Sequence, residues 1–185
     1  MRELSLHILD VVENGITAGG DCIWIEIDED RKKDQIKILI RDNGRGMPVE
    51  KLENIDDPFI TSRTTRRVGL GLSLLAAAAK RCEGTLRVDS ETGKGTKIEA
   101  TFRYTHIDRA PLGDMAATLG TLIIGNPGID FIYTHRIDGK DFFMDTREIR
   151  KEMQDGSLSN PIVIHHLTES IRSSLMELAS AEGAS

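Results

Sequence analysis

Two oxygen-bearing side chains, those of Asp10 and Asn14, lie four residues apart in a stretch with helical periodicity. This spacing places both side chains on one face of a helix, one turn apart. A carboxylate and an amide oxygen on one face suit a hard divalent cation or its bound water, because Mg²⁺ prefers oxygen ligands and keeps several waters. The alternative for this pair, taken alone, is a solvated helix face.

A second candidate group is the segment 42–47 (DNGRGM), which directly follows a predicted strand. Gly44 and Gly46 allow the backbone to turn sharply and a flat ligand to approach it closely. Asp42, at the end of the strand, can accept a hydrogen bond from an exocyclic amine. Taken alone, the segment is equally compatible with a simple turn.

The third group, residues 57–72 (DPFITSRTTRRVGLGL), places three arginines and several hydroxyls before a Gly-x-Gly that opens a predicted helix. Backbone N–H groups, the helix dipole and nearby cations together form a site for phosphate. The third glycine of the Rossmann fingerprint and the Gly-Lys-Ser/Thr of a P-loop are both missing. A flexible, exposed basic stretch is the alternative. A fourth feature, GKGT at 93–96, is alone only a β-turn.

Hydrophobic periodicity predicts the elements that must position these residues. Helices are expected at 3–18, 71–82, 114–124, 146–154 and from 161 to about 179, with a short one near 49–55 inside a long loop at 42–68. Strands are expected at 22–28, 35–41, 85–89, 96–104, 130–134 and 140–145. The alternation of helices and strands predicts an open two-layer sandwich.

The composition excludes several classes of protein. The 185 residues carry 24 Lys and Arg against 30 Asp and Glu, a formal net charge of −6, whereas a nucleic-acid surface requires clustered cations. No apolar run approaches the roughly 18 residues of a membrane span, and the N-terminus lacks the pattern of a signal peptide. We therefore expect a cytoplasmic protein that binds neither nucleic acid nor membrane. Cys22 and Cys82 are expected to be buried thiols rather than metal ligands or a disulfide.

Taken together, the four features resemble the N, G1, F–G2 and G3 boxes of the GHKL superfamily, over roughly residues 3 to 104. The resemblance implies an α+β fold, the two-layer α/β sandwich of the Bergerat ATP-binding fold, with a mixed sheet and helices on one face. It also implies ATP and Mg²⁺ as cofactors. We divide the chain into an ATP-binding domain at 1–106 and a small α+β extension of unknown role at 107–185.

The resemblance also implies a role for each matching residue. Asn14 matches the Mg²⁺-binding asparagine, and Asp42 matches the acceptor for the adenine amino group. Asp10 stands at the position of the general base, and Arg63 stands where a cation meets the γ-phosphate. The other implied nucleotide-binding residues are Gly44 and Gly46 beneath the base with Met47 in the same box, Thr96 near the base, Phe59 and Thr61 in the F box, and Gly69, Leu70, Gly71 and Leu72 in the phosphate loop.

Within the superfamily, the chain looks most like the catalytic domain of sensor histidine kinases. Two hypotheses follow: a kinase that transfers phosphate to a protein partner in trans, or an ATP-gated interaction switch with slow or no hydrolysis. An anti-sigma-type serine kinase is a further alternative, and a homodimer is compatible with each. Asp10 occupies a position that is usually Glu in hydrolytic members, and its shorter side chain argues against fast hydrolysis. His165 and His166 are expected to be ordinary surface or packing residues, not phosphoacceptors.

Overall fold

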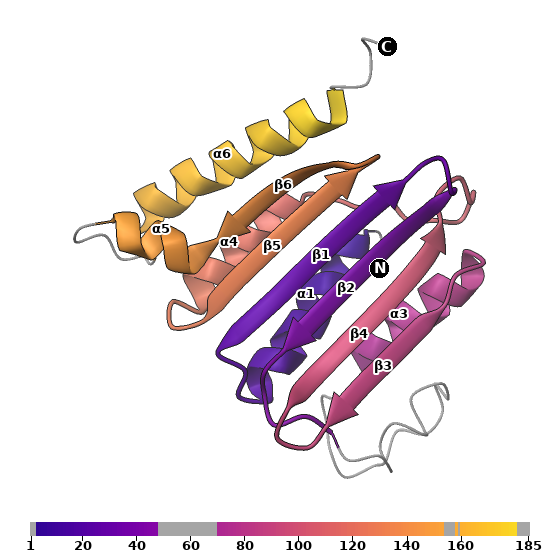
Figure 1. Ribbon diagram of the computed structural model, residues 1–185, viewed down its shortest axis with the longest axis horizontal. Coiled ribbons are helices and arrows are strands. Elements are labelled where there is room, and N and C mark those ends of the chain that lie inside the picture. The colour runs from indigo at the N-terminus through magenta and orange to yellow at the C-terminus, as the bar shows by residue number, and fades with distance from the viewer. Residues whose placement is uncertain (1–2, 48–69, 154–157, 159, 181–185) are drawn as a thin grey trace.

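The computed structural model describes residues 3–47, 70–153, 158 and 160–180 as one mixed six-stranded sheet with helices packed against it (Figure 1). The strand order is β3-β4-β2-β1-β5-β6, and every neighbouring pair is antiparallel except β1 and β5, which are parallel. The strands are β1 (Cys22–Asp30), β2 (Gln35–Asp42), β3 (Leu86–Glu91), β4 (Gly95–Arg103), β5 (Asp130–Ile137) and β6 (Lys140–Asp145). The helices are α1 (Leu4–Thr17), α3 (Leu70–Arg81), α4 (Met115–Gly125), α5 (Thr146–Glu152) and α6 (Pro161–Ser180).

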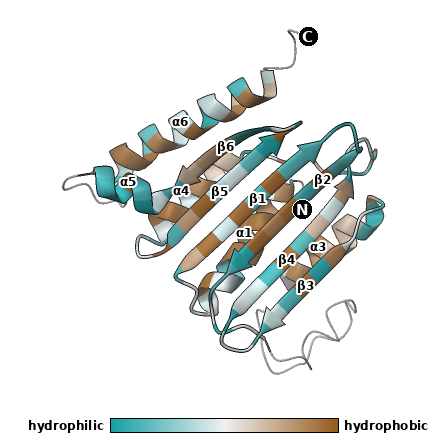
Figure 2. Ribbon diagram, viewed as in Figure 1, coloured by the Kyte–Doolittle hydropathy of each residue, from teal (hydrophilic) through white to brown (hydrophobic). Residues whose placement is uncertain are grey.

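The alternation of apolar and polar residues explains why one face of the sheet is covered. Figure 2 shows hydrophobic and hydrophilic residues alternating along the strands, as expected because successive side chains point to opposite faces. The apolar members of the central strands are buried against α1, α3 and α4, which lie on one face of the sheet (Figure 1). These core positions include Ile23, Ile25, Ile27, Ile36, Ile38, Ile40, Ala100, Phe102, Phe131 and Tyr133.

The segment after residue 106 continues the same sheet. β5 pairs with β1 over eight residue pairs, from Cys22↔Asp130 to Glu29↔Ile137, and β6 completes the edge as a hairpin with β5. α4 packs on α1 and α6, and α6 also contacts β5 and β6. The division of the chain at residue 106 stays a prediction.

The α+β two-layer class is confirmed, and the element ends differ slightly from expectation. β5 reaches Ile137 instead of residue 134, because it pairs with both β1 and β6 along its length. α5 ends at Glu152, two residues earlier than expected. The short helix predicted near 49–55 lies outside the described residues. Cys22 and Cys82 are both buried free thiols, as predicted. Within the described helices, none is long and apolar enough to span a membrane.

Candidate functional site

The Asp42 carboxylate is buried beneath the C-terminal half of α1. Asp42 is the last residue of β2, is only 6% exposed, and lies opposite Thr96 of β4. Gly15 of α1 lies directly against it, because a Cβ built on Gly15 would be 2.9 Å from the Asp42 Cβ and 3.1 Å from its Oδ2. The absence of a side chain at Gly15 therefore leaves the room that the carboxylate occupies.

The surroundings of Asp42 change its acidity. The Gly44 N–H donates a hydrogen bond of 2.9 Å to Asp42 Oδ1. Burial raises the pKa of Asp42 above its ordinary value, while hydrogen bonds from the Gly44 and Thr96 backbone N–H groups partly oppose that rise in pKa. A carboxylate held in this way is a well-oriented buried acceptor, which suits an amine donor from a ligand.

A cluster of glycines packs the loop after β2 against the end of α1. A Cβ on Gly44 would lie 2.9 Å from the Ala18 carbonyl oxygen and 3.1 Å from the Gly20 nitrogen. A Cβ on Gly20 would lie 3.0 Å from the Gly15 carbonyl oxygen. These contacts are too close for larger residues without a backbone shift. Sequence reasoning singled out neither Gly15 nor Gly20 as a site residue, because no local pattern shows what a glycine packs against.

The first turn of α3 lies against the residue pair of α1 that the sequence singled out. A Cβ on Gly71 would be 3.0 Å from the Asp10 Cβ and 3.7 Å from the Asn14 Nδ2. The structure thus brings Asp10, Asn14 and Gly71 together at the start of a helix, where backbone N–H groups favour anions. Leu72, in contrast, is 8% exposed and belongs to the hydrophobic core.

Gly46 and Met47 contact the β3–β4 hairpin. Gly46 has φ +66°, and a Cβ there would overlap the Glu91 carbonyl oxygen. The Met47 N–H donates to Ser90 Oγ at 2.8 Å. Ser90 Oγ also lies 2.9 Å from Thr96 Oγ1. Ser90 therefore links the loop after β2 to the strand residue predicted near the base, and sequence reasoning missed it.

Asn43 hydrogen-bonds the same loop to the start of β1. Its Oδ1 accepts hydrogen bonds from the backbone N–H groups of Asp21 (3.0 Å) and Cys22 (3.1 Å), and its Nδ2 donates to Asp21 Oδ1 at 2.7 Å. These bonds hold the backbone beside Asp42 and Gly44, so Asn43 has a positioning role.

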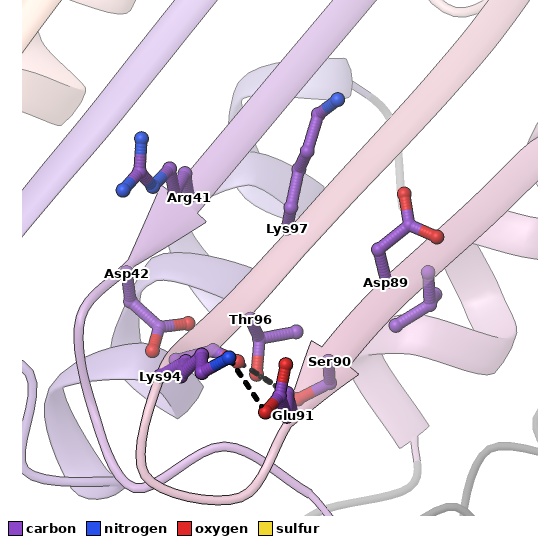
Figure 3. Close-up of a pocket in the computed structure, with 10 residues that line it drawn as sticks. Arg41, Asp42, Asp89, Ser90, Glu91, Lys94, Thr96 and Lys97 are labelled. Atoms are coloured by element: carbon purple, nitrogen blue, oxygen red, sulfur yellow. Dashed lines mark hydrogen bonds and ion pairs between the residues drawn. The ribbon is translucent and has the colours of Figure 1, made fainter.

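An open pocket of about 370 Å³ lies beside Asp42 at the ends of β2, β3 and β4 (Figure 3). Figure 3 shows the Arg41 and Lys97 side chains pointing away from those of Asp42 and Thr96, as expected for adjacent strand residues. The pocket therefore extends around the strand ends to the uncovered face of the sheet. Its lining residues are Arg41, Asp42, Val88, Asp89, Ser90, Glu91, Lys94, Gly95, Thr96 and Lys97.

Several predicted site residues cannot be placed with the others. Phe59, Thr61, Arg63 and Gly69 lie outside the described residues, and Leu70 is known only as the first residue of α3. Asp10, Asn14, Asp42, Gly44, Gly71 and Thr96 are brought together around α1 and the ends of β2 and β4. Their roles toward a ligand stay predictions.

Residues 2–106 match the sequence profile described as "Histidine kinase-, DNA gyrase B-, and HSP90-like ATPase". The chain belongs to this ATPase family. The profile covers α1, the four strands β1 to β4 and α3, which are the elements that carry the residues described above. The assignment to this ATPase family, made from the four boxes, is therefore confirmed.

Curated relatives of this ATPase domain include kinases of the histidine-kinase type. The chain is 32% identical over 101 residues to sporulation kinase C of Bacillus subtilis (strain 168), covering 55% of this chain and 23% of the kinase. It is 30% identical over 125 residues to the non-motile and phage-resistance protein of Caulobacter vibrioides, covering 63% of this chain and 15% of that protein. The chain thus spans less than a quarter of the length of these two relatives.

A solved structure described as the N-terminal domain of a DNA repair protein shares the fold. Its TM-score is 0.52 at 16% sequence identity, and the alignment covers 85% of this chain and 55% of the other. Coverage of 85% means that the aligned region extends beyond residues 2–106 into the C-terminal part of the chain. At this identity the likeness shows the fold alone.

Proposed function

We propose that this chain binds Mg-ATP between α1, the start of α3 and the end of β2, and that it transfers the γ-phosphoryl group to a protein partner in trans. The observation that carries the proposal is the position of two separated segments, the end of β2 and the start of α3, against one helix, α1. Gly15 of α1 lies against Asp42, and Asp10 and Asn14 of the same helix lie against Gly71. Asp42, which would recognise the base, and Gly71, which would recognise the phosphates, would thus both lie beside α1.

The residues present fit a purine triphosphate. The buried Asp42 carboxylate accepts a hydrogen bond from the adenine amino group. Gly15, Gly20 and Gly44 have no side chains, so they leave room beside that carboxylate. The first N–H groups of α3, at Gly71, stabilise phosphate oxygens. Phosphoryl transfer depends mostly on such positioning and on charge stabilisation.

Asn14 is proposed to hold Mg²⁺ through its amide oxygen. The described residues include no group of three or more His, Cys, Asp or Glu side chains that could hold a metal ion, so waters and nucleotide phosphates would complete its coordination, as Mg²⁺ commonly allows. When bound, this ion would neutralise phosphate charge. Asp10, one turn before Asn14, would orient the attacking hydroxyl or imidazole and accept a proton from it.

The second candidate function is an ATP-gated interaction switch, which a specific observation favours. Asp10 stands where hydrolytic members carry Glu, and the shorter side chain reaches less far from α1. A bound nucleotide that turns over slowly could then act by changing a binding surface. Both functions involve a protein partner, and a homodimer is compatible with both.

Incubation of the purified chain with γ-labelled ATP, alone and with extract of the source cell, tests the proposal. Label that moves to a second polypeptide, and that is lost with the Asn14→Ala variant, supports transfer in trans. Saturable ATP binding without labelled protein supports the switch instead. Failure to bind ADP or ATP with or without Mg²⁺ would overturn both functions.

A further inference from the structure

Ser90 of β3 has a hydroxyl group that contacts three polar groups at once. Its Oγ accepts a hydrogen bond of 2.8 Å from the Met47 N–H and lies 3.0 Å from the Gly95 carbonyl oxygen. It also lies 2.9 Å from Oγ1 of Thr96, the residue directly opposite on β4. Ser90 and Thr96 both line the pocket beside Asp42 (Figure 3). The Ser90 hydroxyl is therefore part of the same pocket as the predicted acceptor for the base.

The single hydrogen of the Ser90 hydroxyl fixes the direction of each of these bonds. A serine hydroxyl has one hydrogen to donate and two lone pairs that accept. The Met47 N–H can only donate and the Gly95 carbonyl can only accept, so the Ser90 hydrogen points to Gly95. The bond between the two hydroxyls must then use the Thr96 hydrogen. In the reverse direction, Ser90 Oγ and the Gly95 oxygen would face each other at 3.0 Å with no hydrogen between them.

This direction determines what Thr96 presents to a ligand. A threonine hydroxyl also has one hydrogen, and the bond to Ser90 uses it. Thr96 Oγ1 is therefore left with lone pairs alone and can only accept. The Asp42 carboxylate, which receives a hydrogen bond from the Thr96 backbone N–H, is an acceptor as well. Two acceptor side chains thus lie on directly opposed residues at the ends of β2 and β4.

We propose that Ser90 is a positioning residue that holds Thr96 as an acceptor toward the base, and so favours a 6-amino purine over a 6-oxo purine. The inference rests on the proposed function, which places the base beside Asp42. A 6-amino group offers two N–H donors, one for Asp42 and one for Thr96 or a water bound to it. A 6-oxo group brings lone pairs toward those of Thr96, which has no hydrogen free to meet them. Ser90 acts through Thr96 and needs no contact of its own with the nucleotide.

A purely structural role of Ser90 predicts a different result. The bond from the Met47 N–H also holds the loop after β2, so loss of the hydroxyl would loosen that loop and weaken the binding of every nucleotide. Such loosening lowers the affinities for ADP and for inosine diphosphate (IDP) by the same factor. Loss of the acceptor role changes their ratio instead, because IDP carries a 6-oxo group and a protonated N1. The ratio of the two affinities therefore separates the two roles.

Calorimetry with ADP and with IDP at neutral pH measures this ratio. We expect the wild type to bind ADP at least about tenfold more tightly than IDP, and Ser90→Ala to lower that preference about fivefold, because the Thr96 hydroxyl becomes free to donate to the 6-oxo oxygen. Ser90→Thr, which keeps a hydroxyl and suits a strand, should retain the wild-type preference. Thr85→Ala is the matched control, because its hydroxyl lies 3.0 Å from that of Thr101 at an exposed position, and it should leave both affinities within about twofold.

A double-mutant cycle with Thr96→Val tests whether Ser90 acts through Thr96. Valine keeps the branched shape of threonine but has no hydroxyl, so Ser90→Ala should change the ADP preference of Thr96→Val by less than about twofold. If ADP binds, the inference alone is overturned by any of three results: an unchanged preference in Ser90→Ala, an equal loss of preference in both backgrounds, or a wild type that binds IDP as tightly as ADP. A wild type that does not bind ADP contradicts the proposed function itself, and this inference with it.

Discussion

Gly71 of α3 lies against Asp10 of α1 so closely that a Cβ at position 71 would be 3.0 Å from the Asp10 Cβ. Few real Cβ atoms approach a neighbour at this distance, so the first turn of α3 packs this closely on α1 because residue 71 has no side chain. The contact joins the predicted phosphate loop to the predicted Mg²⁺ and general-base pair. Residues about sixty positions apart in the chain therefore depend on one another's size.

The Gly71→Ala variant should separate nucleotide binding from folding. Alanine favours the helix over glycine by about 0.5–1 kcal/mol, which offsets part of an overpacking cost of about 1–3 kcal/mol. We therefore expect a small change in the free energy of unfolding, but a loss of ADP affinity of about tenfold or more, because the start of α3 shifts from Asp10 and Asn14. Urea unfolding and calorimetry measure the two effects. Gly125→Ala, whose Cβ would meet no atom within 4 Å, is the control, and an equal loss of affinity in both variants would contradict the prediction.

The Asp42→Asn variant should lose adenine recognition without losing stability. Asparagine retains an oxygen for the Gly44 N–H, but its amide group can present a donor where the adenine amine needs an acceptor. We expect ADP affinity to fall by about 1–3 kcal/mol, or roughly 5- to 150-fold, while the melting temperature at pH 7 does not fall, because burial disfavours the charged form of Asp42. Asp89→Asn, at an exposed position of the same pocket, is the matched control. Unchanged discrimination between ADP and GDP in Asp42→Asn would argue against this role.

The raised pKa of Asp42 predicts a pH dependence with opposite signs for binding and stability. Because burial raises the pKa above its ordinary value of 3.8, the carboxyl protonates at a higher pH in the folded chain than in the unfolded chain. The stability that the Asp42 carboxyl contributes is therefore present in full below its pKa in the unfolded chain. This stability is lost as the pH rises through its pKa in the folded chain. ADP affinity should instead fall as the pH is lowered through the folded pKa, since protonation removes the acceptor. ADP titrations of the wild type and of Asp42→Asn across this pH range test the sign of the effect. A fall in ADP affinity of the same size in both proteins would refute the prediction.

The Asn14→Ala variant should lose the dependence of nucleotide affinity on Mg²⁺. Asn14 supplies the proposed oxygen ligand, and alanine cannot replace it. We expect wild-type ATP affinity to rise when Mg²⁺ is added and the affinity of Asn14→Ala to be nearly the same with and without the ion. Glu13→Ala, at the adjacent exposed position of α1, should behave as the wild type. A preserved Mg²⁺ effect in Asn14→Ala would remove Asn14 from the metal site.

The Tyr133→Phe variant should destabilise the fold through a buried hydrogen-bond chain. Tyr133 is fully buried, its hydroxyl lies 2.9 Å from His135 Nδ1, and His135 Nε2 lies 2.8 Å from Glu29 Oε1. Removal of the hydroxyl leaves a buried imidazole nitrogen without its partner, so the free energy of unfolding should fall by about 1–3 kcal/mol.

Tyr104→Phe is the control for this change. The Tyr104 hydroxyl accepts a bond from Arg31 Nε at 3.2 Å in an exposed setting, where loss of a hydroxyl should change stability by about 0.5 kcal/mol or less. Denaturant curves of the two variants measure the difference, and equal destabilisation by both would show that burial does not govern the effect.

The sequence by itself determined the elements and the chemistry that each carries. Alternating isoleucines in β1 and β2 specified strands with one covered face, because a strand exposes successive side chains to opposite sides. The spacing of Asp10 and Asn14 placed them on one helical face, and Asp42 was placed at a strand end by the turn residues that follow it. These inferences need only local geometry, which a short stretch of chain contains.

Only the tertiary structure decided which elements meet. The parallel pairing of β1 with β5 joins residues more than a hundred positions apart, and such pairings depend on packing rather than on local preference. The same holds for Gly15 against Asp42, for Ser90 beside Thr96, and for the burial of His7 inside α1. A glycine or histidine inside a helix has no local signature of what it touches, because its neighbours are set by the way helices and sheet fill the shared core.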